Sequence, residues 1–417
     1  MPALLEQSPA GFRVAELTDP ALEPVAAKLA RGERLSLDDG DLLYRTQDVW
    51  SVCRLADSVR RRLHGDVAYY NINRHLNYSN VCALSCTFCE FYRKQGEDGA
   101  YTRDMDYIRE QARQAVEAGA TEIHSVGGLH PYLPFSYYTD LVRTIRETAR
   151  SMGSDLHVKA FTAVEIVHLA RIAKVHKAAD PESGIRWVLS ELKQAGLGSL
   201  PGGGAEVFDD RVHDEAFKGK IRSDQWLLVH KIAHELGLNT NATMLYGHIE
   251  DRRERLVHMD MLRQAQDAAL ARIARGSGAF GSFQAIIPLP FFPDGSDLEH
   301  LPGPSGLENL RTLAIARLML DNFPHVKAFW IMQTLPMAQL MLQCGADDVD
   351  GTVVWYDITK LSHGTGQGSS GDHVGTHQEV DARALRKAIR EAGFEPVERD
   401  TLYRRVSRDG RAWHVQP

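Results

Sequence analysis

The sequence has no uninterrupted apolar run of the roughly 18 residues that a membrane-spanning helix needs. Residues 1–8 lack both the basic region and the apolar core of a secretory signal peptide. Long blocks of Lys and Arg are also absent, and we interpret the short runs at 60–62 and 252–253 as solvated helix faces. These absences predict a protein that binds neither membranes nor nucleic acids.

Cysteine is scarce as well, with 5 in 417 residues. The number is odd and three of the five lie in one short stretch, which argues against a disulfide framework and for a reducing cytoplasm. Cys53 and Cys344 have helix-like surroundings, and we interpret both as core residues without a function. The composition, 43% hydrophobic and 25% charged with a formal net charge of -7, is typical of a globular protein long enough for one large barrel or two domains.

The other three cysteines, Cys82, Cys86 and Cys89, are spaced Cys-x-x-x-Cys-x-x-Cys, and Phe88 precedes the last of them. Three thiolates in one loop can bind three irons of a [4Fe–4S] cubane and leave the fourth iron open to a small molecule. A structural zinc site would need a fourth ligand, and no Cys or His follows Cys89 at close spacing. The spacing therefore favours an iron–sulfur cluster.

An alternative is that the three cysteines are core residues of one helix, because positions i, i+4 and i+7 share a helix face. Ser85, Thr87 and the preceding segment 77–80 have poor helix propensity, which disfavours this interpretation. The spacing, with Phe88, instead resembles the radical S-adenosylmethionine (SAM) superfamily. In that superfamily the amino and carboxylate groups of SAM chelate the open iron.

The chain is predicted to fold as an α/β protein. Residues 1–66 have the pattern of a helical cap, and from residue 67 short apolar or β-branched runs alternate with amphipathic helices, which indicates βα units and a parallel sheet. Eight units in residues 67–358 predict a closed (β/α)8 barrel of the TIM type, and residues 359–417 a C-terminal extension that packs on it. The predicted strands span 67–76, 122–126, 155–160, 199–200, 239–245, 282–287, 326–331 and 349–354.

Smaller segments complete the predicted organisation. A helix is expected at 381–392 and a short strand-like end at 401–406. The composition of 362–371 predicts a flexible loop, and we interpret 175–184 and 268–280 as surface insertions.

Glycines and a carboxylate follow the predicted strands. Gly127 and Gly128 follow the second strand, where a backbone without side chains can approach a ligand, although a tight turn would also explain them. Glu206 ends a run of three glycines and could bond a ribose diol or an amine, or it could be an acid at a helix N-terminus. Tyr246 directly follows the fifth strand, whose apolar residues could equally be barrel core. By resemblance to the superfamily, these four residues and Phe88 are the predicted SAM contacts.

Basic side chains gather at the predicted strand ends, and a barrel mouth lined in this way favours an anion, such as a ligand with carboxylates. Each one alone could be a structural residue, above all a lone His. Phe291 and Phe292, between prolines, would add a rigid aromatic wall for a flat ring, or would simply pack. With Phe291, the candidate substrate contacts are Arg74, His75, His130, Lys159 and His248, and His124 belongs to the same basic set.

A narrower resemblance is carried by the segments 77–82 with Cys86 and Cys89, 127–131, 159–165, 200–206, 241–248 and 301–304. Together they are similar to aminofutalosine synthase (aminodeoxyfutalosine synthase), the radical SAM family of the futalosine route to menaquinone. The resemblance covers roughly residues 67–356. Glu90 stands where the family usually has a small residue such as Ala, a departure that removes no ligand.

The resemblance implies a radical addition with a [4Fe–4S] cluster and SAM as cofactors. A 5'-deoxyadenosyl radical would add to the enol ether double bond of 3-[(1-carboxyvinyl)oxy]benzoate, and aryl migration and loss of a carboxylate would give 6-amino-6-deoxyfutalosine and bicarbonate. The protein would hold this aryl enol ether dicarboxylate against C5', exclude water and fix two carboxylates. A flavodoxin or ferredoxin would be the reductant.

Two alternatives stay open. One is a related radical SAM reaction, that of dehypoxanthine futalosine cyclase or of an F0 synthase subunit, whose families share the cysteine loop. The other is a non-enzymatic iron–sulfur carrier or a zinc-stabilised binding module, although a carrier normally ligates all four irons. The sequence carries no signal of the oligomeric state.

Overall fold

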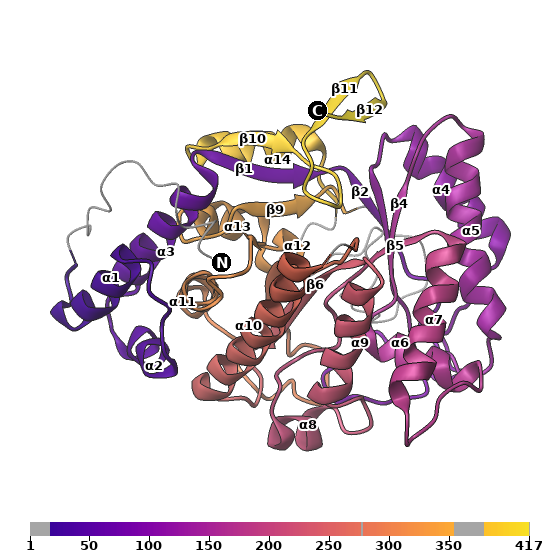
Figure 1. Cartoon of the computed structure of the whole chain (residues 1–417), viewed down its shortest axis with the longest axis horizontal. Helices are drawn as coiled ribbons and strands as arrows, with labels where there is room; N and C mark the ends of the chain where they lie inside the picture. Colours follow the sequence, from indigo (N-terminus) through magenta and orange to yellow (C-terminus); the bar gives the residue numbers. More distant parts are fainter. Residues whose placement is uncertain (1–16, 277, 354–378, 417) are drawn as a thin grey trace.

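The computed structural model describes residues 17–276, 278–353 and 379–416 (Figure 1). The predicted flexible loop at 362–371 lies outside these ranges. Helices surround a curled parallel sheet, and the N-terminal helices and the C-terminal segment lie at one side of it (Figure 1). No helix in the described part of the chain is both long and apolar enough to cross a bilayer.

The central sheet has seven parallel strands in chain order, as expected when each strand is followed by a crossover helix. Neighbouring strands are in register over their buried residues, for example Ile123 with Val158 and Met244 with Pro288. The strands are β2 (Asn73–Leu76), β3 (Glu122–Ser125), β4 (His157–Ala160), β5 (Leu197–Leu200), β6 (Asn239–Tyr246), β7 (Phe283–Pro290) and β8 (His325–Val326).

A second parallel sheet lies between the two ends of the first. It has the order β10 (Glu395–Glu398), β1 (Val67–Asn71) and β9 (Asp348–Gly351). A parallel bridge between Lys327 and Asp348 connects the end of β8 to β9, and β1 runs on through one residue into β2. The eight predicted strand regions therefore each contain a strand and the α/β barrel fold is confirmed, but the ring is divided into two hydrogen-bonded sheets.

The division occurs because the predicted first strand, 67–76, is broken at Ile72. The register of β1 with β9 shifts between Tyr69 and Asn71, and the Asn73 side chain accepts a hydrogen bond from the Val353 amide at 2.8 Å. Gly351 allows this close approach, since a Cβ there would lie 2.3 Å from the Oδ1 atom of Asn73. β1 is thus displaced towards β9 and β10, and β2 alone pairs with β3.

Several of the helices that follow the strands begin at polar caps. Asp104, Thr162, Asp251 and Ser305 each accept a backbone hydrogen bond from the first helical turn, as N-cap residues do. The helices are α4 (Met105–Glu117), α5 (Phe135–Ser151), α6 (Ala163–Ile172), α7 (Pro181–Ala195), α8 (Asp210–Ala216), α9 (Ser223–Glu235), α10 (Arg252–Arg275), α11 (Gly306–Met319), α12 (Trp330–Gln333) and α13 (Leu335–Leu342).

The N-terminal helices form in the region where a helical cap was predicted. They are η2 (Pro20–Leu22), α1 (Glu23–Ala30), α2 (Leu37–Arg45) and α3 (Val49–His64). α3 packs on α11 and α2 packs on α10, so this segment covers one side of the barrel (Figure 1). Cys53 of α3 and Cys344 are both buried in the hydrophobic core, as predicted.

The C-terminal segment contains α14 (Ala382–Glu391), as predicted, then β10 and a hairpin of β11 (Val406–Asp409) and β12 (Ala412–Val415). The predicted strand at 401–406 is wrong, because 401–403 form a turn and the strand begins at Val406. The predicted insertion at 268–280 is also wrong in its first part, where α10 continues to Arg275.

The seventh predicted strand extends too far along the chain. The predicted strand 326–331 ends at Val326, and α12 begins at Trp330 within the same apolar run. A short apolar run does not distinguish a buried strand from a buried helix, which explains the error.

Candidate active site

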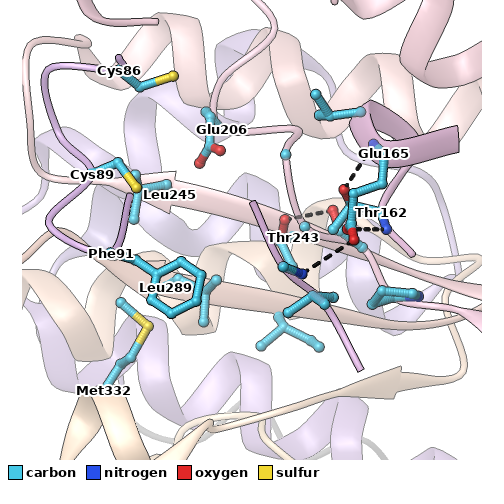
Figure 2. A pocket seen from close by; sticks show the side chains of 18 of the residues that line it. Cys86, Cys89, Phe91, Thr162, Glu165, Glu206, Thr243, Leu245, Leu289 and Met332 are labelled. Atoms are coloured by element: carbon cyan, nitrogen blue, oxygen red, sulfur yellow. Dashed lines mark hydrogen bonds between the residues drawn. The ribbon is translucent and has the colours of Figure 1, made fainter. Parts of the chain in front are cut away.

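A cavity of about 390 Å³ lies inside the barrel at the carboxyl ends of the strands. The cysteine loop forms one side of it, and residues of β2, β3, β4, β6, β7 and β9 and of the segments that follow the strands also line it. Figure 2 shows the sulfurs of Cys86 and Cys89 at one side, Thr162 and Glu165 at the other, and Glu206 between them. The predicted catalytic end of the barrel therefore contains a single chamber shared by the cysteines and the strand ends.

The cysteine loop is irregular and contains no helix, so the interpretation of the cysteines as one helix face is wrong. Cys82, Cys86 and Cys89 all line the cavity. The Cys82 Sγ accepts hydrogen bonds from the amides of Leu84 and Leu129, both at 3.4 Å, as thiolate ligands commonly do. The loop thus presents three sulfurs to one chamber.

The spacing of these sulfurs fits a cluster better than a single ion. Sulfurs around one zinc with bonds of about 2.3 Å would lie about 3.8 Å apart. Within the described residues, the three cysteine sulfurs do not all lie within 4.8 Å of one another, so at least one pair of them is farther apart than two sulfurs on one zinc would be. A cubane, in which each cysteine binds a different iron, accommodates this spacing.

Burial determines the protonation of the free thiols. It raises the pKa of Cys86 to about 11 and also raises the pKa of Cys89. Both thiols would therefore be protonated at neutral pH without metal, and iron would displace the protons on binding. Cluster uptake should accordingly release protons and favour high pH.

The glycine pair after β3 is packed against the cysteine loop. The Gly128 amide donates to the Ser79 carbonyl at 2.8 Å, and a Cβ on Gly128 would lie 2.3 Å from the Val81 carbonyl oxygen. A Cβ on Gly127 would lie 2.6 Å from the Tyr78 ring. Both glycines also line the cavity, so close approach to the cysteine loop is one firm reason for their lack of side chains.

Glu165 holds the same region together from the start of α6. Its carboxylate accepts hydrogen bonds from the Tyr78 hydroxyl at 2.8 Å, the Gly127 amide at 3.2 Å and the Thr162 amide at 2.7 Å. Burial raises the pKa of Glu165 to about 7, although these donors oppose the rise. Glu165 belongs to the segment 159–165 that resembles the family, but no role was predicted for it from the sequence.

Glu206 is buried at the cavity edge, in an ion pair with Lys220. Its backbone has φ of 48°, a left-handed conformation that is uncommon for a residue other than glycine. α8 begins only at Asp210 and is capped by Asp209, so Glu206 is not a helix N-terminal acid. The strained backbone and the ion pair direct the carboxylate into the chamber (Figure 2).

The inner end of the cavity is lined by buried ion pairs. Lys159 contacts Glu122 at 2.8 Å, and Lys327 contacts Asp350 at 3.0 Å. The Lys159 and Glu122 side chains are 6% and 1% exposed, so these charges are almost completely withdrawn from solvent. Of these four residues, which we call the charged floor, the sequence analysis identified only Lys159.

Two histidines lie beside the charged floor. The rings of His75 and His124 have centroids 4.5 Å apart, and both residues line the cavity. Burial lowers the pKa of His75 to about 4 and holds the pKa of His124 well below its ordinary value. Both imidazoles are therefore neutral at physiological pH and can donate or accept a hydrogen bond without carrying charge.

Four predicted contacts do not line the cavity: Arg74, His130, Tyr246 and His248. Side chains alternate along a strand, and on β6 it is Asn241, Thr243 and Leu245 that face the chamber. Tyr246 therefore points away from it, and its hydroxyl donates to Asn309 at 2.8 Å and accepts from Gln333 at 3.1 Å. Arg74 precedes His75 on β2 and faces outward for the same reason.

The two excluded histidines bond to the backbone of their own loops. His130 Nδ1 accepts hydrogen bonds from the amides of Tyr132 and Leu133, both at 3.2 Å. His248 Nε2 lies 3.0 Å from the Leu245 carbonyl oxygen. Each histidine is thus used to shape a loop, which is the structural role that the sequence analysis left open.

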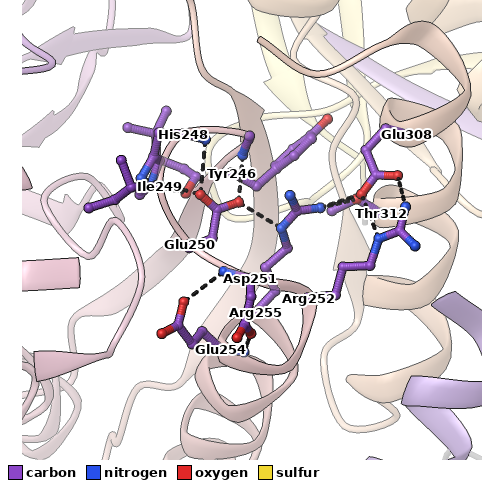
Figure 3. A network of polar contacts seen from close by, with 12 residues as sticks. Tyr246, His248, Ile249, Glu250, Asp251, Arg252, Glu254, Arg255, Glu308 and Thr312 are labelled. Atoms are coloured by element: carbon purple, nitrogen blue, oxygen red, sulfur yellow. Dashed lines mark hydrogen bonds and ion pairs between the residues drawn. The ribbon is translucent and has the colours of Figure 1, made fainter. Parts of the chain in front are cut away.

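The loop after β6 is fixed by a buried carboxylate network (Figure 3). Glu250 accepts hydrogen bonds from the amides of Gly247 and His248 at 2.6 and 2.9 Å. Arg255 links Glu250, at 2.7 Å, to Glu308, at 2.6 Å, and so connects the loop to α11. This network supports the wall of the chamber on which Leu245 lies.

The remaining wall is apolar. Phe291, a predicted contact, lines the cavity, as does Phe88. Figure 2 shows Phe91, Leu289 and Met332 gathered on the side below the cysteines. The flat apolar ring of a ligand would pack between these side chains. Any charged groups on that ligand would have to reach the charged floor.

Comparisons with known proteins agree with this geometry. Residues 76–262 match the model of the Radical SAM superfamily, and residues 280–409 match the CofH/MqnC C-terminal region. An aminodeoxyfutalosine synthase of Thermus thermophilus is 43% identical over 94% of this chain and 97% of its own length. One from Streptomyces coelicolor is 41% identical over 90% of this chain and 92% of its own.

More distant relatives have other activities. A 5-amino-6-(D-ribitylamino)uracil--L-tyrosine 4-hydroxyphenyl transferase of Methanopyrus kandleri is 33% identical over 96% of this chain and 99% of its own. Among solved structures, methylornithine synthase superposes with a TM-score of 0.64 at 17% identity, over 89% of this chain and 96% of its own, a likeness of fold alone. The chain is an enzyme that belongs to the radical SAM superfamily and, within it, to the aminodeoxyfutalosine synthase family.

Proposed function

We propose that the chain joins the 5'-deoxyadenosyl group of SAM to 3-[(1-carboxyvinyl)oxy]benzoate to give 6-amino-6-deoxyfutalosine. Methionine leaves from SAM, the aryl group migrates, and one carboxylate is lost and takes up water to leave as bicarbonate. A bound [4Fe–4S] cluster and SAM would supply the 5'-deoxyadenosyl radical. The observation that carries the proposal is one shared chamber with three cysteines at one end and two buried lysines at the other. A substrate that must meet a radical and present two carboxylates needs both ends.

The cysteine side of the chamber supports the cofactor assignment. Cys82, Cys86 and Cys89 would hold the cluster, and the backbone of Gly127 and Gly128 lies against the same loop. Glu206 has its carboxylate in the chamber between the cysteines and β6, within reach of a ribose diol or an amine. Phe88 adds a ring beside Cys89. Of the five predicted SAM contacts, four therefore remain as proposals. Tyr246 does not line the cavity and instead bonds Asn309 and Gln333.

The charged floor supports a dicarboxylate substrate. Lys159 and Lys327 are each neutralised by one acid in the free protein, so a substrate carboxylate would compete with Glu122 or Asp350 for the ammonium group. His75 and His124 are neutral donors at the same depth and would add hydrogen bonds to a carboxylate without a further charge. We propose His75, Lys159 and Phe291 as substrate contacts from the original set.

The apolar wall supports the radical step. A carbon radical is quenched by hydrogen donors and diverted by water, so a chamber for such chemistry benefits from side chains that exclude water. Leu245, Leu289 and Phe291 are apolar side chains that line the same chamber as the cysteines and the charged floor. Their role would be to hold the aryl ring and the alkene away from solvent.

The test is an anaerobic reaction of the reconstituted protein with SAM, dithionite and 3-[(1-carboxyvinyl)oxy]benzoate, followed by mass spectrometry. We expect an adenosine-containing adduct of the substrate with the mass of 6-amino-6-deoxyfutalosine. Omission of the benzoate is the control and should leave 5'-deoxyadenosine as the SAM-derived nucleoside. Turnover of dehypoxanthine futalosine, with none of the benzoate, would overturn the assignment in favour of the cyclase.

The reductant and compartment follow from the same chemistry. We propose that a flavodoxin or ferredoxin supplies the electron and that the enzyme works in the reducing cytoplasm, where its five thiols stay free. Reduction by a purified flavodoxin and its reductase in place of dithionite would test the first part.

A further inference from the structure

The end of α8 and the segment that follows it are fastened to the cysteine loop. The Thr87 amide and hydroxyl both donate to the Ala216 carbonyl, at 3.2 and 2.8 Å. The ring of Phe88 packs edge-on against Phe217 with centroids 6.0 Å apart. This segment therefore carries Lys220 to a fixed place beside the cysteines, although Lys220 is distant from them in sequence.

Lys220 is a nearly buried cation in this place. Its side chain is 14% exposed, and its Nζ lies 4.7 Å from the centroid of the Phe88 ring. Phe88 stands between Cys86 and Cys89 in the chain, and Lys220 lines the same cavity as these cysteines. The ammonium group therefore lies beside the cysteine loop, where it can act on charge placed on the sulfurs.

Lys220 does not act alone, because Glu206 pairs with it and is itself only 10% exposed at its side chain. The two side chains form a buried dipole beside the cysteines, with the carboxylate in the chamber. A charge held in this surrounding is weakly screened by water, so its effect on a neighbouring group is larger than at the surface.

We propose that Lys220 sets the reduction potential of the [4Fe–4S] cluster that the three cysteines hold, and that Glu206 limits its effect. Reduction adds one negative charge to the cluster, and a fixed cation nearby favours the reduced form. Lys220 is then a positioning residue that makes the cluster easier to reduce, and Glu206 offsets part of its charge. The proposal rests on the proposed function only in requiring that a cluster is bound, and it is independent of the substrate.

The test is a redox titration of the anaerobically reconstituted full chain without SAM or benzoate, followed by the electron paramagnetic resonance signal of the reduced cluster. We expect Lys220→Met, which keeps an apolar stem on Phe88, to shift the midpoint to a more negative potential. Glu206→Gln should shift it in the opposite direction, because it leaves the Lys220 charge uncompensated. Loss of packing alone has no reason to move the two variants in opposite directions.

Two controls complete the design. Lys220→Arg keeps the charge and should stay near the wild-type midpoint, and Lys218→Met removes an exposed charge from the same segment and should leave it unchanged. Equal midpoints for Lys220→Met and wild type, at equal iron and sulfide content, would overturn the proposal. If Lys220→Met takes up no cluster, Glu206→Gln decides, and an unchanged or more negative midpoint overturns it. Neither result depends on whether the protein forms the benzoate adduct, so a failure of this proposal is distinguishable from a failure of the proposed function.

Discussion

The Glu165 carboxylate accepts a hydrogen bond from the Gly127 amide at 3.2 Å, which joins the first turn of α6 to the loop that follows β3. The same carboxylate accepts the Tyr78 hydroxyl, so one buried acid connects the approach to the cysteine loop, the glycine pair and α6. The geometry of the cysteine side of the chamber thus depends on a residue that is not a ligand.

The first prediction concerns pH and Glu165. Burial raises its pKa from 4.5 to about 7, so the folded state binds a proton there that the unfolded state releases between these values. The contribution of Glu165 to stability is therefore full below about pH 4.5 and falls by about 3 kcal/mol as the pH rises to about 7. The change can be measured as the difference in thermal stability between the wild type and Glu165→Gln from pH 5 to 8. The wild type should lose stability relative to the variant, and parallel curves would contradict the prediction.

The second prediction concerns the cysteines. Cys82→Ala, Cys86→Ala and Cys89→Ala should each abolish reductive cleavage of SAM, because each removes one iron ligand. The barrel should stay folded by circular dichroism. Cys53→Ala and Cys344→Ala are matched controls with the same chemical change in the core, and both should retain cleavage. Cleavage that persists in any of the first three would contradict the ligand assignment.

The third prediction separates structure from binding at the charged floor. Lys159→Met leaves Glu122 buried without its partner and should cost about 3 to 5 kcal/mol in the free energy of unfolding. Lys159→Met with Glu122→Gln removes both charges and should recover most of that stability. If Lys159 binds a substrate carboxylate, the double variant should still have a raised KM for the benzoate, measured by adduct formation. Wild-type KM in the double variant would exclude Lys159 as a contact.

The fourth prediction tests Tyr246, which the sequence placed against SAM. Its hydroxyl bonds Asn309 and Gln333 behind the chamber wall, so Tyr246→Phe should lower the free energy of unfolding by about 1 to 2 kcal/mol. The KM for SAM should stay near the wild-type value. A large rise in that KM, with stability unchanged, would restore Tyr246 as a SAM contact.

The sequence predicted the cysteine loop and the strand order because both leave local signals. Cysteine spacing is read directly, and each βα unit repeats the same change of hydrophobic period. The break at Ile72 left no such signal, because it depends on Asn73 bonding to Val353, a residue far along the chain. The predicted end of the seventh strand was wrong because one apolar run continues from β8 into α12.

The candidate site was predicted less completely than the fold. A residue near a strand end was treated as facing the chamber, but alternation along β6 turns Tyr246 away while Leu245 faces inward. Glu122 and Asp350 were not predicted, because only the fold shows that each of these acids pairs with a lysine of the charged floor. Lys220 could not have been found, since only the packing of its segment on the cysteine loop brings it near.

The pairing of β1 with β10 also constrains the order of assembly during synthesis. β1 leaves the ribosome early, yet its two neighbours, β9 and β10, belong to the last part of the chain to be made. The cysteine loop is translated soon after β1 and remains on an open sheet until those strands arrive. We expect iron and sulfide to have their freest access to the cysteines in this interval, before the C-terminal strands close the wall.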